Sequence, residues 1–292
     1  MTRFRTWGTL AVVVLVGAGC GGGGSGDKPA GALTALGRRL PGPIAERRTL
    51  DVGSDVAYAP VEFFEEGTQK AVGIDVDVCN AMVAKFGEGF TCRFRNTTFD
   101  GLIPALQAQR FDVIMSALSD TKERQGAVDL IDYFSAGTSI LVVKGNPANI
   151  RALDDLCGKT VGLQRGTTQE TLANAQKSTC EGAGSTLDIL TFDKDTDALL
   201  ALKAGRSVAD MNDFPVAAYN AKVSGGGGDF EVVGQQVDAA PYGVGVRKQD
   251  VALRDALREA LQAVIADGTY DRVLTKWDVA QGALKTAAIN GG

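Results

Sequence analysis

An arginine at the start of a predicted helix is the first residue in this chain whose type and position could do chemistry. Residues 111–115 form a short apolar run typical of one buried parallel strand. A small polar turn leads from it to Asp120, which we expect to cap the helix, and to Glu123, which would complete a capping box. Arg124 follows in the first helical turn, where a cation opposes the helix dipole.

A bound anion would compensate for this unfavourably placed cation. The free N–H groups of a helix N-terminus attract anions, and the planar guanidinium of arginine suits a carboxylate. The alternative is a weak exposed ion pair between Arg124 and either Glu123 or Asp129. The turn by itself does not decide between the two.

The composition excludes several classes of site. The chain has 292 residues, a net charge of −5 and no histidine. Without histidine, Ser–His–Asp and Cys–His catalysis and most zinc or transition-metal sites are excluded, so acid–base chemistry would fall to carboxylates, Lys, Tyr or Cys. The mild acidity gives no support for nucleic-acid binding. We therefore expect no metal, no cofactor and no nucleic-acid partner, and the length indicates about two domains.

The N-terminus has the pattern of an export signal. Arg3 and Arg5 precede an apolar run over residues 10–16 that is too short to span a bilayer, and small residues then lead to Cys20. Residues 1–20 are interpreted as a lipoprotein signal peptide with Cys20 lipidated, and an ordinary secretory signal is the alternative. Both place the mature protein outside the cytoplasm, and the first adds a lipid anchor to the membrane. Residues 21–47 are interpreted as a flexible tether.

The four remaining cysteines fit two disulfides. Cys79 and Cys92 fall in one predicted strand–helix unit, and Cys157 and Cys180 fall in another. In an oxidising compartment these two local bridges are the simplest pairing, although four cysteines allow three pairings. No pair has the C-x-x-C spacing of a zinc or redox motif.

Strand and helix patterns alternate along the chain, which predicts an α/β fold with a mainly parallel sheet. Strands are predicted at residues 49–52, 91–94, 111–115, 139–143, 160–164, 208–211 and 243–246. Helices are predicted to begin at Asp75, Asp100, Asp120, Thr167, Thr196, Pro215 and Asp250. The segment at Thr167, a T-x-x-E capping box after a strand and a glycine turn, repeats the layout around Arg124.

Several segments, in this order and spacing, resemble the polar-amino-acid solute-binding proteins of bacteria (family 3), which serve ABC importers. The most specific of them lie at residues 73–78, 99–106, 111–114, 121–124, 166–170 and 267–270. The resemblance implies a two-lobe periplasmic-binding-protein-like fold of type II, with two crossover strands as the hinge and the ligand between the lobes. It also implies a monomer that works with an ABC permease and ATPase.

The resemblance sets expected lobe boundaries. Lobe 1 would comprise residues 48–143 and 242–292, and lobe 2 residues 144–241. The two crossings would fall near residues 142–144 and 240–242.

The resemblance also implies which residues hold the ligand's α-carboxylate. Arg124 and Ser119 match the lobe-one groups that meet it, and Thr167 and Thr168 match a threonine-rich turn of lobe two. For Thr168, a simple helix-capping role is the alternative.

Other positions match the groups that meet the rest of the ligand. Ala117 and Asp213, together with the same serine, match positions that hold the α-ammonium group, and a helix cap is the alternative for Asp213. Asp55, Tyr58 and Phe99 match positions beside the ligand's side chain. Core packing is the alternative for the two aromatic residues, although aromatic faces in a cleft loop favour stacking on a ligand.

The side-chain pocket favours a basic amino acid. The glutamate-binding members carry an arginine where Asp55 stands, so an acidic ligand is disfavoured. Gln164 replaces the lysine of the glutamine-binding member, and Val61 replaces the usual Phe. We therefore expect arginine, lysine or histidine ahead of glutamine.

Two functions of other classes remain open at this point. Enzymes that resemble cyclohexadienyl dehydratase share the fold and use a protonated carboxylic acid in the cleft. The presence of both Arg124 and Asp213 favours amino-acid binding over this chemistry. A sensor module that reports to a separate receptor is the other alternative.

Overall fold

The structure of the protein is a computed structural model that describes residues 31–292. The predictions for the signal peptide, for Cys20 and for the first part of the tether lie outside the described residues. Within the described range, none of the helices combines the length and the apolar character needed to cross a membrane.

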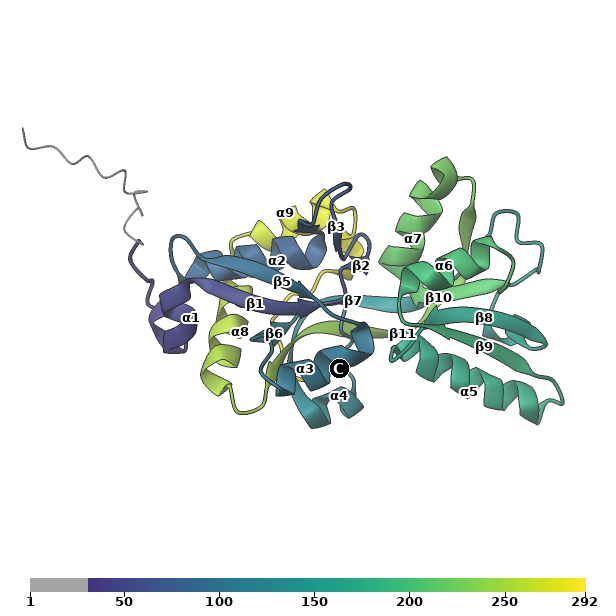
Figure 1. Ribbon diagram of the computed structural model, residues 1–292, viewed down its shortest axis with the longest axis horizontal. Helices are drawn as coiled ribbons and strands as arrows, with labels where there is room; N and C mark the ends of the chain where they lie inside the picture. The colour runs from purple at the N-terminus through teal and green to yellow at the C-terminus, as the bar shows by residue number, and fades with distance from the viewer. Residues whose placement is uncertain (1–30) are drawn as a thin grey trace, which may run out of the picture. The chain divides into compact units, whose positions relative to one another are not determined.

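One mixed sheet of eight strands runs through the molecule (Figure 1) in the order β5-β1-β6-β11-β7-β10-β8-β9. Its strands are β1 (Thr49–Ser54), β5 (Thr91–Asn96), β6 (Val113–Ile114), β7 (Val128–Val143), β8 (Lys159–Gln164), β9 (Leu187–Phe192), β10 (Ala209–Asp213) and β11 (Phe230–Arg247). The outer strands pair in parallel at both ends of the sheet, whereas β7 and β11 pair antiparallel to each other in the middle. A small second sheet contains β2 (Ala57–Tyr58), β3 (Glu62–Phe64) and β4 (Ala71–Val72).

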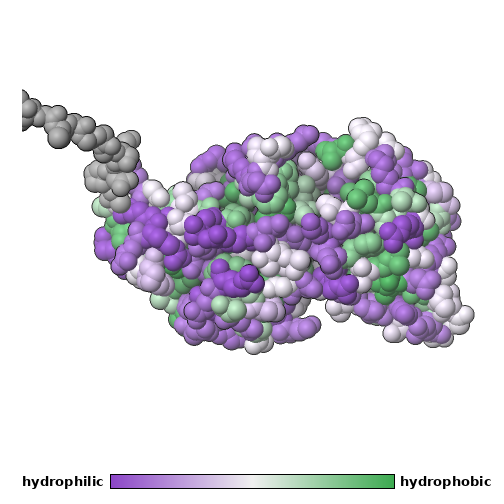
Figure 2. Space-filling view, viewed as in Figure 1, coloured by the Kyte–Doolittle hydropathy of each residue, from purple (hydrophilic) through white to green (hydrophobic). Residues whose placement is uncertain are grey.

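Helices cover the sheet separately at its two ends. The first half carries α1 (Gly42–Arg47), α2 (Ile74–Val83), α3 (Leu102–Gln107), α4 (Lys122–Ala127), α8 (Val251–Ala266) and α9 (Thr269–Lys276). The second half carries α5 (Thr168–Gly182), α6 (Asp195–Lys203) and α7 (Phe214–Val223). Figure 2 shows hydrophilic side chains over most of the face in view, with apolar side chains gathered in smaller patches.

The apolar cores show where one half gives way to the other. Along β7, Ala136 packs in the core of the first half and Ile140 in that of the second. β7 therefore contributes side chains to both cores. The apolar run over residues 139–143 is only the second part of a longer strand, and the break at Lys144 marks the end of that strand. Along β11, Phe230 belongs to the second half and Tyr242 to the first.

The tether expected over residues 21–47 is too long. Within its described part, a 3₁₀ turn (Gly37–Arg39) and α1 pack on the first half, with Leu40 and Ile44 buried in its core. Arg39 adds an ion pair to Glu259 of α8 at 2.5 Å. Two apolar side chains that cover the end of a core outweigh the glycine- and proline-rich composition that suggested flexibility.

Two predicted helix caps were also wrong. Thr121, and not Asp120, caps α4, because its side-chain oxygen accepts from the backbone N–H of Arg124 at 3.3 Å. Asp100 lies inside a 3₁₀ turn (Phe99–Gly101) that Thr98 precedes and that leads into α3. All of these residue types favour N-caps, so the choice between neighbours depends on tertiary contacts.

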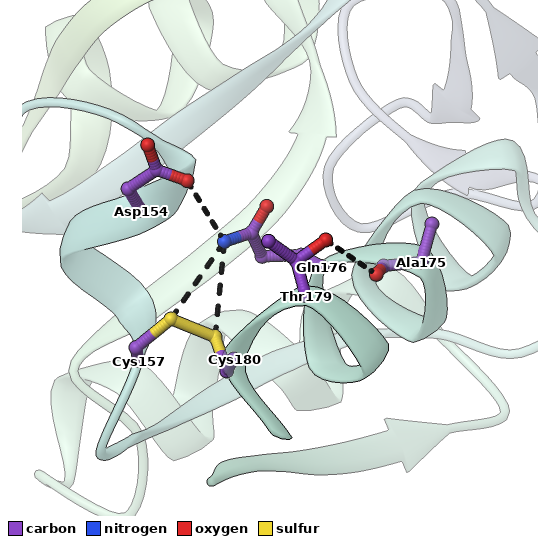
Figure 3. Close-up of a disulfide and its surroundings, with 6 residues drawn as sticks. All are labelled: Asp154, Cys157, Ala175, Gln176, Thr179 and Cys180. Atoms are coloured by element: carbon purple, nitrogen blue, oxygen red, sulfur yellow. Dashed lines mark hydrogen bonds between the residues drawn. A yellow bond between two sulfur atoms is a disulfide. The ribbon is translucent and has the colours of Figure 1, made fainter. Parts of the chain in front are cut away.

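Both predicted disulfides are present. Cys79–Cys92 joins α2 to β5, with a Cα–Cα distance of 6.2 Å. Cys157–Cys180 joins the turn before β8 to α5, with a Cα–Cα distance of 5.4 Å. Figure 3 shows the amide of Gln176 against both sulfurs of this second bridge, at 3.7 Å from each. Each bridge is local to one half of the molecule.

Candidate functional site

All nine residues predicted to contact a ligand line one cavity, to which both halves contribute. The complete lining is Asp55, Tyr58, Glu62, Phe99, Ser116, Ala117, Ser119, Arg124, Gln164, Thr167, Thr168, Gln169 and Asp213.

The cavity lies where strands of both halves end. Asp55 directly follows β1, and Asp213 is the last residue of β10. The loop from β6 to α4 supplies Ala117 and Ser119, and the first turn of α4 supplies Arg124. Ligands of open α/β sheets bind at the carboxyl ends of the strands, so the position of this cavity follows from the topology.

The loop after β6 has a strained backbone. Ala117 has φ of 45°, a left-handed conformation that is uncommon for a residue other than glycine. Its N–H donates to the Asp75 carboxylate at 3.2 Å, and the other oxygen of Asp75 accepts from the Tyr133 hydroxyl at 2.6 Å. Such strain persists only where the surroundings hold it, and it is common at binding sites.

Arg124 is held towards the cavity by neutral groups. Its guanidinium donates to the Ser119 carbonyl at 2.9 Å and to the Gly166 carbonyl of the second half at 3.1 Å. It also lies 5.3 Å from the centre of the Phe99 ring. Burial lowers the pKa of Arg124 to about 10, so the side chain is still a cation at neutral pH.

The alternative ion pair of Arg124 does not form. Among the described residues, Arg124 has no carboxylate within salt-bridge distance, and Asp129 instead pairs with Lys248 at 3.1 Å and Arg254 at 2.8 Å. A buried guanidinium without an anion is expensive unless something else provides the countercharge.

Asp213 provides an acid from the other half. One carboxylate oxygen accepts from Gln169 at 2.9 Å and the other from the Tyr58 hydroxyl at 3.2 Å. Burial raises the pKa of Asp213 to about 6, which still leaves a carboxylate at neutral pH. Asp213 precedes α7 at the N-cap position, but its side chain makes no capping bond. Its side chain is therefore directed to the cavity and does not serve the helix.

The threonine-rich turn begins a long helix whose N-terminus borders the cavity. Thr167 caps α5 by accepting from the Glu170 N–H at 3.2 Å, so Thr168 is not the cap. In a capping box, the Glu170 side chain would accept from the N–H of the cap residue Thr167. It accepts instead from the N–H of Gly166, one residue earlier, at 2.7 Å.

The sequence reasoning missed Glu62, a fully buried acid in the cavity wall. One oxygen of Glu62 accepts from Ser116 at 2.8 Å, and the other has no hydrogen-bond partner among the described residues. Burial, followed by the charge of Asp75, raises the pKa of Glu62 well above its usual range. A charged residue inside the apolar segment 61–64 was the available signal. Ser116 and Gln169 were missed as well, and both are polar neighbours of predicted site residues.

Contacts between the halves surround the cavity. Tyr58 reaches Asp213, Arg124 reaches Gly166, and Gln164 donates to Asp55 at 2.6 Å. Burial raises the pKa of Asp55 to about 6. A hollow is visible at the waist of the molecule in Figure 2, and an open groove bounded by α4 and α5 shares Arg124, Thr167 and Thr168 with the cavity.

Two α/β halves joined by two long strands, with opposite charges facing one cavity, define a two-lobed binding protein of type II. Residues 50–280 match the model of the bacterial extracellular solute-binding proteins, family 3. The chain belongs to this family, and it is therefore a binding protein that works outside the cytoplasm.

Relatives and solved structures agree with this assignment. The histidine-binding and the lysine/arginine/ornithine-binding periplasmic proteins of Escherichia coli K12 are each 33% identical over 235 residues, which is 79% and 78% of this chain and 87% of each relative. An ancestral arginine-binding protein bound to arginine superposes with a TM-score of 0.72 at 36% identity, covering 79% of this chain and 98% of the other. The ancestral protein bound to glutamine gives 0.71 at 37% identity, with 80% and 99% covered.

Proposed function

We propose that this protein binds a free basic amino acid between its two lobes and delivers it to an ABC importer. The single observation that carries the proposal is the placement of Arg124 and Asp213. They come from opposite halves, line one cavity and carry opposite charges. An α-amino acid has one group for each of them.

The ligand's carboxylate would lie between Arg124 and the N-terminus of α5, where Thr167 and Thr168 begin the helix. Its ammonium group would lie by Asp213, Ser119 and Ala117. Because the two ends are held by different lobes, the ligand binds the closed form better than any open form and shifts the population towards closure.

The ligand's side chain would extend towards Asp55 and Glu62, between the rings of Tyr58 and Phe99. The carboxylate of Asp55 at this end favours a cation over an amide, because a buried carboxylate gains most from a charged partner. The names of the relatives agree, since they specify histidine, lysine, arginine and ornithine. Glutamine, bound by one solved neighbour, is the competing ligand in the test below.

The cell context is also part of the proposal. We infer that Cys20 carries a lipid that anchors the mature protein to the membrane, and that an ABC permease and ATPase receive the ligand from a monomer. We infer a lobe 1 made of residues up to about 136 and from about 242, with lobe 2 between them, because the two cores separate there.

A thermal-shift screen of the protein without residues 1–20 tests the function. A specific ligand stabilises the folded state by RT ln(1 + [L]/Kd), about 2.7 kcal/mol at 100 times Kd. Arginine, lysine or histidine is expected to give the largest rise in melting temperature, and calorimetry then gives Kd. A screen in which no basic amino acid binds, or in which an acidic one binds best, would contradict the proposal. Turnover of prephenate or arogenate would support the enzyme instead.

A further inference from the structure

The clasp segment, residues 287–292, lies against the turn that carries Arg124, and Figure 1 marks the end of the chain beside α4. We propose that the clasp segment positions residues 118–125, the turn that holds the ligand's carboxylate, by acting through Asp120. This inference rests on the proposed function for the role of that turn.

The clasp segment is first anchored to β7. Ile289 pairs with Ile131 in an antiparallel bridge, and the backbones of Asn290 and Leu130 are joined at 2.8 Å. The side-chain oxygen of Asn290 also accepts from the Leu130 N–H at 2.9 Å, and its amide donates to Asp129 at 3.3 Å. The clasp segment thus covers backbone groups of β7 that the neighbouring strand β11 does not pair.

The clasp segment then reaches the binding turn. The N–H of Gly292 donates to the Asp120 carboxylate at 3.0 Å. The Gly292 carbonyl accepts from Lys122 at 2.6 Å and from Gln125 at 3.2 Å, both on α4. Gln125 also donates to Asp120 at 2.8 Å, so one connected network joins the clasp segment, the turn and the helix that carries Arg124.

The hinge strand holds the turn from the opposite side. The N–H of Asp120 donates to the Pro241 carbonyl at 2.6 Å, and the N–H of Gly243 donates to the Leu118 carbonyl at 2.8 Å. Ser119 lies between these two attachments, and its carbonyl accepts from Arg124. A shift of Asp120 would therefore move the carbonyl that aims the guanidinium.

The close approach of the clasp segment leaves no space for larger residues. A Cβ atom on Gly292 would come 2.2 Å from the Asp120 carbonyl oxygen, and one on Gly291 would come 2.6 Å from an Asp132 carboxylate oxygen. The N–H of Gly291 donates to Asp132 at 3.2 Å, next to buried Asp120. Two neighbouring acids thus receive N–H groups from successive glycines.

Two variants test this role. Asn290→Gly removes the side-chain bonds but allows the positive φ of 55° at this position, and a second variant lacks residues 290–292. Lys285→Ala, which changes an exposed residue before the clasp segment, is the matched control. The measurements are the Kd for arginine by calorimetry and backbone hydrogen exchange, peptide by peptide.

We expect both variants to bind arginine at least about tenfold more weakly, which is the size of effect expected when hydrogen bonds to a charged group are lost. Amide exchange should rise in residues 118–125 and stay unchanged in β8 and α5. An unchanged Kd in Asn290→Gly would overturn the proposal. Amide exchange that rises equally throughout the molecule would also overturn it, because such a rise indicates general destabilisation. If the wild-type protein binds no basic amino acid, the proposed function fails, whereas the exchange pattern still tests the hold on the turn.

Discussion

Replacement of Arg124 is the prediction that the geometry defines most sharply. Arg124→Ala removes a partly buried cation whose protein partners are the two carbonyls of Ser119 and Gly166 and the face of Phe99. None of these groups neutralises its charge. In the proposed complex, the ligand's carboxylate is the anion that does.

The expected loss follows from this lack of an alternative partner. Truncation of one member of a buried charge pair costs about 2–5 kcal/mol, much of it because the other charge is left unpaired. At about 1.4 kcal/mol per factor of ten, Kd for arginine should rise by roughly 30-fold to several thousand-fold. Arg124→Lys keeps a charge but loses the planar fork, so we expect an intermediate loss.

Calorimetric titration with arginine measures both variants. Arg165→Ala is the control, because Arg165 lies beside the same cleft turn but is exposed and pairs with exposed Asp193 at 3.4 Å. That variant should bind within about twofold of the wild type, as expected for a surface ion pair. Binding by Arg124→Ala within about threefold of the wild type would refute the reasoning, since that corresponds to well under 1 kcal/mol.

Further predictions concern selectivity, pH and the disulfides. Asp55→Asn should weaken binding of arginine about tenfold or more relative to glutamine, measured by parallel titrations, because only the cation needs the carboxylate; equal losses for both ligands would count against the assignment. Because burial raises the pKa values of Asp55 and Asp213 to about 6, affinity for arginine should fall as the pH drops below about 6 and be flat above 7. Burial also raises the pKa of Asp75 to about 7. Between pH 4 and 7 the folded state therefore keeps a proton on Asp75 that the unfolded state has lost, and the free energy of unfolding should decline as the pH rises through this range. Asp75→Asn should flatten that decline in urea titrations, and an unchanged slope would contradict the shift. Replacing Cys157 and Cys180 by serine should lower the free energy of unfolding by about 2–4 kcal/mol, with no loss expected if the bridge does not form.

Local chemistry made part of the site predictable. A cation in the first turn of a helix is unfavourable by itself, so Arg124 stood out without any tertiary information. The T-x-x-E pattern located the start of α5 at Thr167 for the same kind of local reason. The resemblance to the family then assigned partners to these two turns, and the structure brings all of the assigned residues to one cavity.

Contacts between distant segments were not predictable. Glu62 was not singled out from the sequence, and Ser116, which donates a hydrogen bond to it, lies far along the chain. Asp120 looked like a cap, but its carboxylate accepts from Gln125 and from Gly292, which is 172 residues away. The full lengths of β7 and β11 were also hidden, because residues near the hinge lack the continuous apolar pattern that marks a buried strand.

The most direct measurement is a crystal structure of the protein with L-arginine. The account predicts one arginine in the cavity, with its carboxylate on Arg124 and the N-terminus of α5, its ammonium group on Asp213 and its guanidinium towards Asp55. An arginine bound in the opposite direction, or held by one lobe alone, would contradict it.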